Sequence, residues 1–226
     1  MSMFVEKMAC SKCRKEYDPH ENPLMCNDLG RIDIYYDYEA VKEALTKETL
    51  RNRGNDTWRW KELMPVDEKY ATKLGEGGTP LIKAERLAEE LGLNELYLKD
   101  ETRNPTASFK DRAMAVGVAK AVEMGVKVAA TASSGNAAAA LAAYSAKAGI
   151  NTVAFVLESA SEGKIAQLLL YGAKVVKVRG LESGRDPTVK MLLEVVKRRG
   201  WYPCPSFGPF NPYQVCLLYT SPSPRD

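Results

Sequence analysis

The chain has 226 residues, of which 45% are hydrophobic and 27% charged, so it is long enough to bury a sizeable core and is not expected to be disordered. A net charge of +3, with basic and acidic residues interleaved, does not favour a nucleic-acid partner. The most apolar run, Ala137–Ala143, is far too short to span a membrane, and no signal peptide is recognisable, so we expect a soluble, cytoplasmic protein. The single histidine, His20, excludes two-histidine metal sites within these residues.

The first feature along the chain is a group of cysteines with the spacing of a metal-binding ribbon. Cys10 and Cys13 form a Cys-x-x-Cys knuckle, and Cys26 stands where the second knuckle of a zinc ribbon would begin, so disulfides are not expected. The fourth ligand of such a ribbon is expected three residues after Cys26, where the sequence has leucine. His20 or Asp28 could replace that ligand only if the loop folds back. We therefore expect a degenerate ribbon that holds zinc weakly or not at all.

Residues 32–101 predict scaffold elements. These are an edge strand at Ile32–Tyr38, a charged helix from Glu39 to about Asn52, a glycine-rich turn at Gly75–Leu81, a helix at Glu85–Leu91 and a half-buried strand at Glu95–Glu101. The glycine-rich turn lacks the trailing lysine of a P-loop and the spacing of a dinucleotide fingerprint. It is therefore predicted to be a tight connection and not a phosphate site.

The segment Asn104–Arg112, Asn-Pro-Thr-Ala-Ser-Phe-Lys-Asp-Arg, carries a candidate catalytic residue, Lys110. The sequence predicts a helix over Phe109–Met124, with Thr106 or Ser108 as its cap. Lys110 lies in the first turn, where the helix dipole and burial disfavour a charged amine, and a neutral lysine suits Schiff-base chemistry with a carbonyl cofactor. On this segment alone, a surface lysine beside an aspartate is the simpler interpretation. Small residues recur every fourth position of the helix, which predicts the close approach of a neighbouring element, at Ala113, Gly117 and Ala121.

A second candidate site follows the predicted strand Val126–Ala132. Ser133, Ser134, Gly135 and Asn136 separate this strand from an alanine-rich helix that extends to about Ala148. A small polar turn between a strand and a helix start can hold an anion, because free N–H groups and the helix dipole point at the ligand. Taken alone, the turn is simply a good N-terminal cap.

The remaining elements alternate between strand and helix. They are a strand at Asn151–Glu158, a helix at Glu162–Tyr171, a strand at Lys174–Arg179, a helix at Asp186–Arg199 and a short strand at Trp201-Tyr202. This alternation predicts a parallel sheet with helices on both faces, whose site lies at the carboxyl ends of the strands.

Together, the two candidate segments resemble the pyridoxal-phosphate enzymes of the tryptophan-synthase-β-like fold, known as fold type II, and among them most closely the threonine synthases. In that family the segment Asn-Pro-Thr-Gly-Ser-Phe-Lys-Asp-Arg carries the lysine that binds the cofactor, which corresponds to Lys110. The resemblance implies that Asn136 faces the phenolic oxygen of the cofactor. It also implies that the substrate carboxylate is held by Ser133, Ser134 and Gly135. The chain departs from the family pattern where it has Ala107 and Ala113, since glycine is usual or common at both positions.

The resemblance extends from about Cys10 to Gln214 and implies an α/β fold with three-layer parallel sheets, truncated here. It divides the chain into a zinc-ribbon-like segment at 1–30, the N-terminal part of the larger cofactor domain at 31–115 and a smaller α/β domain at 116–214. Residues 216–226 back-translate to a transposon-based sequencing-library adapter, and the tail at 215–226 is predicted to be non-native.

The implied activity is that of a lyase that uses pyridoxal 5'-phosphate to convert O-phosphohomoserine and water to threonine and phosphate. The implied substrate is a small amino acid, with no nucleic-acid or membrane partner, and the full-length protein is expected to be a homodimer. Cysteate synthase and threonine dehydratase share the fold and stay open, as does a non-catalytic ribbon protein that binds nucleic acid or a protein partner. Family members place a loop for the cofactor phosphate further downstream, so we expect the 226-residue chain to be an inactive fragment.

Overall fold

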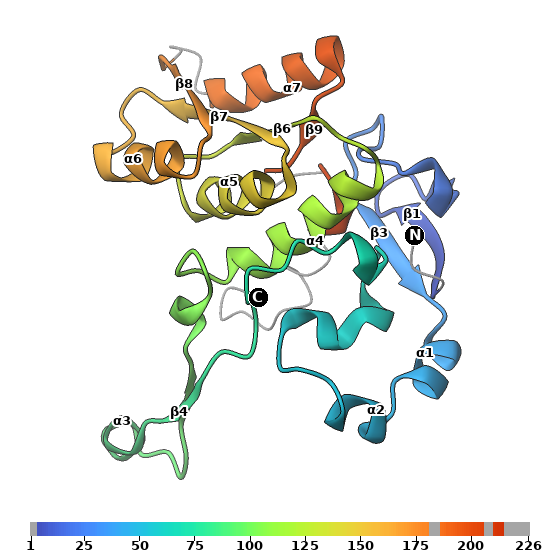
Figure 1. The fold of residues 1–226 in the computed structure, drawn as a ribbon, viewed down its shortest axis with the longest axis vertical. Helices are drawn as coiled ribbons and strands as arrows, with labels where there is room; N and C mark the ends of the chain where they lie inside the picture. The colour runs from blue at the N-terminus through green and yellow to red at the C-terminus, as the bar shows by residue number, and fades with distance from the viewer. Residues whose placement is uncertain (1–3, 181–185, 206–209, 215–226) are drawn as a thin grey trace.

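A computed structural model describes residues 4–180, 186–205 and 210–214, in which the strands form three separate sheets (Figure 1). The tail predicted at 215–226 lies outside the described residues. The domain boundaries predicted after residues 30 and 115 stay predictions. Among the residues that the structure describes, no helix combines the length and the apolar character that crossing a bilayer requires.

The N-terminal sheet is antiparallel and has the strand order β2-β1-β3. Its strands are β1 (Val5–Cys10), β2 (Glu16–Tyr17) and β3 (Ile32–Tyr36), and β3 is an edge strand as the sequence predicts. The ribbon-like segment contributes β1 and β2, which hydrophobic alternation did not reveal. A short 3₁₀ turn at Pro19–Glu21 follows β2.

The single helix predicted from Glu39 to Asn52 is wrong, because the chain forms two short helices, α1 (Tyr38–Ala44) and α2 (Lys47–Arg51). The break occurs at Thr46, whose hydroxyl accepts a hydrogen bond from the Thr49 N–H at 3.1 Å, while the Thr49 hydroxyl accepts one from the Thr46 N–H at 2.8 Å. This reciprocal capping box starts a new helix where the periodicity suggested a continuous one. Two 3₁₀ segments follow, at Thr57–Leu63 and Glu68–Tyr70.

The strand predicted at Glu95–Glu101 is shorter in the structure and belongs to an antiparallel hairpin. Strand β5 (Tyr97–Lys99) pairs with β4 (Leu81–Lys83), and α3 (Glu85–Glu90) lies between them in the chain. All residues of both strands are exposed, so the prediction of a half-buried strand is wrong. Figure 1 shows this hairpin projecting from the body of the protein at the lower left.

The third sheet is parallel throughout and confirms the predicted α/β architecture. Its strands are β6 (Val128–Ala132), β7 (Asn151–Leu157), β8 (Lys174–Val178) and β9 (Tyr202–Pro203), in the order β8-β7-β6-β9. The chain moves outward from β6 to β8 and then returns to place β9 on the other side of β6. The strand order therefore reverses between β6 and β9, which is where parallel sheets of this kind bind ligands.

Helices cover both faces of this sheet. Helix α7 (Pro187–Arg199) lies on one face, and α5 (Asn136–Ala148) and α6 (Glu162–Leu170) lie on the other (Figure 1). Strand β7 shows the alternation that this requires, since Val153 and Phe155 share a core with Leu192 of α7, whereas Ala154 packs toward α5 and α6.

Helix α4 (Lys110–Glu123) packs against the outer side of α5. The close approach predicted for its small residues is confirmed at Gly117, where an added Cβ would lie 3.1 Å from Gln214 Cβ and 3.3 Å from Cys204 Sγ. The hydroxyl of Tyr202 also donates to the Gly117 carbonyl at 3.0 Å. The segment around β9 is thus held directly on the helix that begins with Lys110.

Candidate active site

Lys110 is the first residue of α4, so it lies in the first turn of the helix, as the sequence predicts. The predicted cap at Thr106 or Ser108 is wrong, because the N-cap residue is Phe109 and its side chain makes no capping bond. The Ser108 hydroxyl instead accepts a hydrogen bond from the Lys110 N–H at 3.2 Å. The Lys110 side chain is half-buried, with Nζ 4.6 Å from the centroid of the Phe109 ring. The amine therefore stands at a helix N-terminus and is partly withdrawn from solvent.

The loop before Lys110 is tied to the helix through Asp111, which is fully buried. The two carboxylate oxygens of Asp111 accept hydrogen bonds from the Thr106 N–H and the Thr106 hydroxyl, both at 2.9 Å. Burial raises the pKa of Asp111 above its usual range. Asp111 is therefore an internal anchor of the loop and not the solvent-exposed partner that a simple surface lysine would have.

Ala107 stands at the tip of this loop with φ of +57°, in the left-handed region that favours glycine. Its N–H donates to the Asn104 carbonyl at 2.8 Å and closes the turn. The backbone conformation explains why glycine is usual at this position in the family that the segment resembles.

Arg112 and Glu101 form a two-bond ion pair that sequence reasoning missed. Arg112 Nε and Nη2 donate to the two carboxylate oxygens of Glu101, each at 2.7 Å, and the Thr79 hydroxyl donates to Glu101 Oε1 at 2.6 Å. The Arg112 guanidinium lowers the pKa of Glu101 to about 2. The pair joins the start of α4 to the chain that precedes it, and its only sequence signal was the Lys-Asp-Arg motif.

The glycine-rich turn is organised by Glu76, whose side chain is fully buried. Its carboxylate accepts hydrogen bonds from Trp58 Nε1 at 2.7 Å, from the Tyr144 hydroxyl at 3.0 Å and from the Leu74 N–H at 2.9 Å. Burial, followed by the negative charge of Glu76, raises the pKa of Tyr144. Gly77 has φ of +92°, and an added Cβ there would lie 2.5 Å from the Thr57 nitrogen. These contacts support the prediction of a tight connection.

Residues Ser133 to Asn136 connect β6 to α5 at the point where the strand order reverses. Ser133, Ser134 and Gly135 are half-buried and Asn136 is exposed, so a ligand can reach this turn. The Gly135 N–H donates to the Ser133 hydroxyl at 3.2 Å, which shapes the turn. Helix α5 has 13 residues, and its N-terminal N–H groups and dipole favour an anion here.

The two candidate segments start neighbouring helices. Lys110 begins α4 and Asn136 begins α5, and these helices pack against each other through a shared apolar core that includes Met114, Val118 and Leu141. The packing joins two helices whose first residues are 26 positions apart in the chain.

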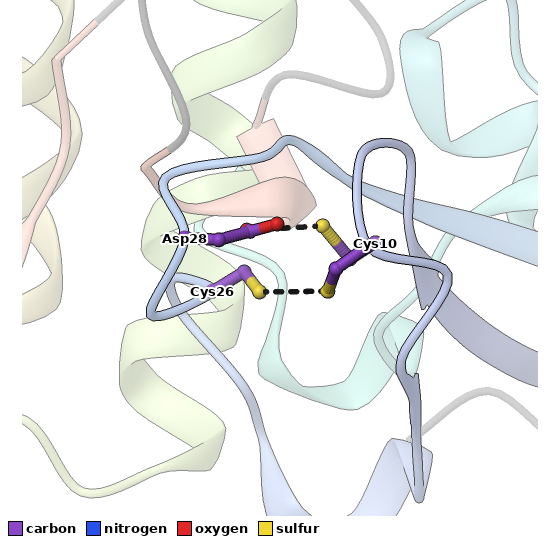
Figure 2. A group of neighbouring side chains, drawn as sticks. Cys10, Cys26 and Asp28 are labelled. Carbon is purple, nitrogen blue, oxygen red and sulfur yellow. Dashed lines mark hydrogen bonds between the residues drawn. The ribbon is translucent and has the colours of Figure 1, made fainter.

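The three candidate metal ligands also meet in space. Cys10, Cys13 and Cys26 lie together with Asp28, and the four ligand atoms are within 4.8 Å of one another (Figure 2). Of the two substitutes that the sequence left open for the fourth ligand, the structure therefore places Asp28, and not His20, in this group.

Comparisons with known proteins agree with the resemblance. A family model described as pyridoxal-phosphate dependent enzyme matches residues 72–221, a range that includes Lys110 and the turn at 133–136. The chain is 44% identical over 204 residues to the threonine synthase of Methanocaldococcus jannaschii, which covers 89% of this chain and 50% of that protein. It is 45% identical over 175 residues to the threonine synthase of Methanosarcina acetivorans, which covers 76% of this chain and 42% of that protein.

Among solved structures, O-ureido-L-serine synthase matches with a TM-score of 0.50 and 28% identity, over 56% of this chain and 40% of that chain. The chain spans about half the length of the curated relatives that it matches.

Proposed function

Because the chain belongs to the family of pyridoxal-phosphate-dependent enzymes, we propose that it carries the lysine-bearing part of a threonine synthase, which converts O-phosphohomoserine and water to threonine and phosphate. The threonine synthases similar to this chain support the choice of reaction, and the match of the family model over Lys110 and 133–136 supports the choice of site.

The observation that carries the proposal is the position of the Ser133–Asn136 turn. It lies at the carboxyl end of β6, at the reversal of strand order, on a helix packed directly against the one that Lys110 begins. A ligand at this turn would meet its hydroxyl groups and the N-terminus of α5, and we infer that the Lys110 amine approaches it from the neighbouring helix.

The residues present fit pyridoxal phosphate. The cofactor has an aldehyde, a phenolic oxygen and a phosphate, and when bound it supplies an electron sink for the reacting carbons of an amino acid. Lys110 offers a half-buried amine at a helix start, so Lys110 would hold the cofactor. Asn136 offers an exposed amide for the phenolic oxygen.

The substrate carboxylate is assigned to Ser133, Ser134 and Gly135, whose hydroxyl and N–H groups precede the positive end of the α5 dipole. The Lys110 amine would move protons at the α and β carbons of the substrate. Asp111 keeps the backbone at Lys110 in place through its two bonds to Thr106.

The test uses the protein in a form that spans the full length of the relatives, because the chain covers only about half of that length. After incubation with pyridoxal phosphate and reduction with borohydride, peptide mass mapping should find the pyridoxyl group on Lys110. A label on Lys99, Lys120 or Lys127 would contradict the assignment.

Phosphate release from O-phosphohomoserine, with threonine as the second product, tests the reaction itself. Lys110→Ala should abolish turnover, whereas Lys127→Ala, which changes an exposed lysine after α4, should leave it unchanged. Asn136→Ala should keep the fold, since the side chain is exposed, and weaken cofactor binding about tenfold through one lost hydrogen bond to a charged oxygen. Labelling of Lys110 without release of phosphate would support the assignment of the cofactor site and contradict O-phosphohomoserine as the substrate.

A further inference from the structure

A cluster of metal-ligand side chains lies beside the N-terminal sheet, in a part of the chain that the proposed reaction does not use. Cys10 and Cys26 are fully buried, Cys13 is exposed and Asp28 is half-buried. Figure 2 shows the Asp28 carboxylate and the Cys26 thiol directed toward the loop that carries Cys10. The ligand atoms of the four residues lie within 4.8 Å of one another, although two separate loops supply them.

The distances between these atoms match a tetrahedral zinc shell. With Zn–S bonds of about 2.3 Å and a Zn–O bond of about 2.0 Å, tetrahedral angles separate two sulfur ligands by about 3.8 Å and a sulfur from an oxygen by about 3.5 Å. The Sγ atoms of Cys13 and Cys26 are 3.6 Å apart, and Cys10 Sγ is 3.4 Å from Asp28 Oδ1. A zinc ion fits between the four atoms with little adjustment.

Backbone geometry prepares both loops for this role. The Lys12 N–H donates to Cys10 Sγ at 3.4 Å, and the Gly30 N–H donates to Asp28 Oδ1 at 2.9 Å. In each loop, a backbone N–H two residues after the ligand residue therefore orients the ligand atom. An added Cβ on Gly30 would lie 2.3 Å from Cys10 Sγ, so only glycine leaves room for the ligands. Leu29 turns the chain with φ of +58° and leaves its own side chain exposed.

We propose that Cys10, Cys13, Cys26 and Asp28 bind one structural zinc ion, with Asp28 as the fourth ligand in place of a cysteine. Four protein ligands close the coordination shell, as in structural and not catalytic zinc sites. Three thiolates and one carboxylate give the loaded centre the same net charge as a four-cysteine site. Lys12 adds a neighbouring positive charge, since its Nζ donates to the Asp28 carbonyl at 3.0 Å. The expectation that zinc is held weakly rested on Leu29, and Asp28 removes that reason.

The zinc site would stabilise more than its own loops. Two residues before Cys26, the Leu24 carbonyl accepts a hydrogen bond from the Asn211 N–H at 2.7 Å. The Asn211 amide lies 3.3 Å from the hydroxyl of Tyr202, which donates to the Gly117 carbonyl in α4. Zinc at Cys26 therefore fixes one end of a series of contacts that leads to the helix of the proposed active site.

The first experiment measures metal content and the ligand shell in the unaltered chain, purified from zinc-supplemented cells. We expect one zinc per chain after gel filtration, and zinc-edge X-ray absorption should show three sulfur atoms at about 2.3 Å and one oxygen at about 2.0 Å. A metal-free protein, a shell of four sulfur atoms or the outer-shell signal of an imidazole would overturn the assignment. A Cys13–Cys26 disulfide in the isolated protein would also overturn it.

The second experiment compares variants by competition with a chelator. Asp28→Ala should lower zinc affinity at least tenfold, and Asp28→Cys should retain it. His20→Ala is the matched control and should bind zinc as the unaltered chain does. Leu29→Cys added to Asp28→Ala should not restore binding, because the side chain at position 29 is exposed to solvent, whereas Cys10 and Cys26 are buried. Unchanged affinity in Asp28→Ala would refute the proposal. If that variant does not fold, the absorption spectrum of the cobalt-substituted unaltered chain tests the ligand set instead. A shell of three sulfur atoms and one oxygen differs from a four-sulfur shell in its charge-transfer bands.

Discussion

The left-handed conformation of Ala107 makes a sharp prediction for the loop that precedes Lys110. We expect Ala107→Gly to stabilise the protein, although replacing alanine by glycine usually destabilises it. Ala107 has φ of +57° and is exposed, so its methyl group is strained by the backbone and contributes no buried contact. The hydrogen bond from its N–H to the Asn104 carbonyl does not depend on the side chain and should remain.

The expected size of the effect follows from two opposing terms. A left-handed conformation costs a residue other than glycine about 1–2 kcal/mol. Glycine adds unfolded-state entropy that costs about 0.5–1 kcal/mol. The difference is a gain of about 0.5–1 kcal/mol in the free energy of unfolding for Ala107→Gly.

Urea denaturation followed by circular dichroism measures this gain. The matched control is Ala146→Gly, which replaces another exposed alanine, but one within the helix α5, and should lose about 0.5–1 kcal/mol. The two substitutions are chemically identical, so opposite signs isolate the backbone conformation as the cause. Equal destabilisation by both would show that Ala107 is not held in the left-handed region.

Two further outcomes follow from packing and charge. Gly117→Ala should destabilise the protein by about 1 kcal/mol despite the better helix propensity of alanine, because the new Cβ would lie 3.1 Å from Gln214 Cβ. The control is Gly163→Ala in α6, whose new Cβ meets nothing within 4 Å, so this change should be neutral or stabilising. Equal effects of the two changes in urea denaturation would refute the close approach at Gly117. Glu101→Gln should cost about 2 kcal/mol at neutral pH, because it removes the charge that Arg112 binds. The pKa of Glu101 is lowered to about 2 in the folded state, so the unfolded chain binds the proton more readily. The stability that the ion pair contributes is therefore present above the unfolded pKa of about 4.5 and is lost as pH falls toward 2. The difference between the two proteins should therefore shrink over that range, and a difference that stays constant with pH would contradict the ion pair.

The parallel sheet and its helices could be predicted because their signals are local. Strand β7 contains an apolar run at 153–157 with polar residues on either side, and Pro187 marks the start of α7 at the expected place. The errors occurred where a local interaction of another kind overrode the periodicity. Thr46 and Thr49 cap each other and divide a helix that the charge pattern showed as continuous.

The exposed hairpin was mispredicted for a different reason. Tyr97 and Leu98 look like residues of a buried strand, but β5 pairs only with β4 among the described residues, and the hairpin leaves both side chains in solvent. Alternation of apolar residues predicts that a strand exists and not what covers it.

In the candidate site, too, the local features could be predicted and the long-range contacts could not. Lys110 and the turn at 133–136 could be found because each has a local sequence signal at the start of a helix. The contacts that hold them in place join distant residues, such as Glu76 with Tyr144, and no spacing rule connects positions 68 residues apart. The glycine-rich turn was correctly interpreted as a connection, but the buried carboxylate that organises it had no recognisable pattern.

The fourth position of the cysteine cluster shows how backbone conformation can decide a ligand. The spacing rule assumes two similar knuckles and assigns the donor to the third residue after Cys26, which is leucine. In the structure that leucine takes a left-handed conformation and leaves its side chain exposed, while the preceding residue, Asp28, points its carboxylate at Cys10. Gly30, which follows the leucine, has no side chain and lies against the sulfur of Cys10. The loop can therefore approach Cys10 closely enough for Asp28 to reach it. A ribbon that lacks a cysteine at the expected place can therefore still have a fourth ligand. We expect the affinity for zinc to change when Asp28 is replaced and not when Leu29 is.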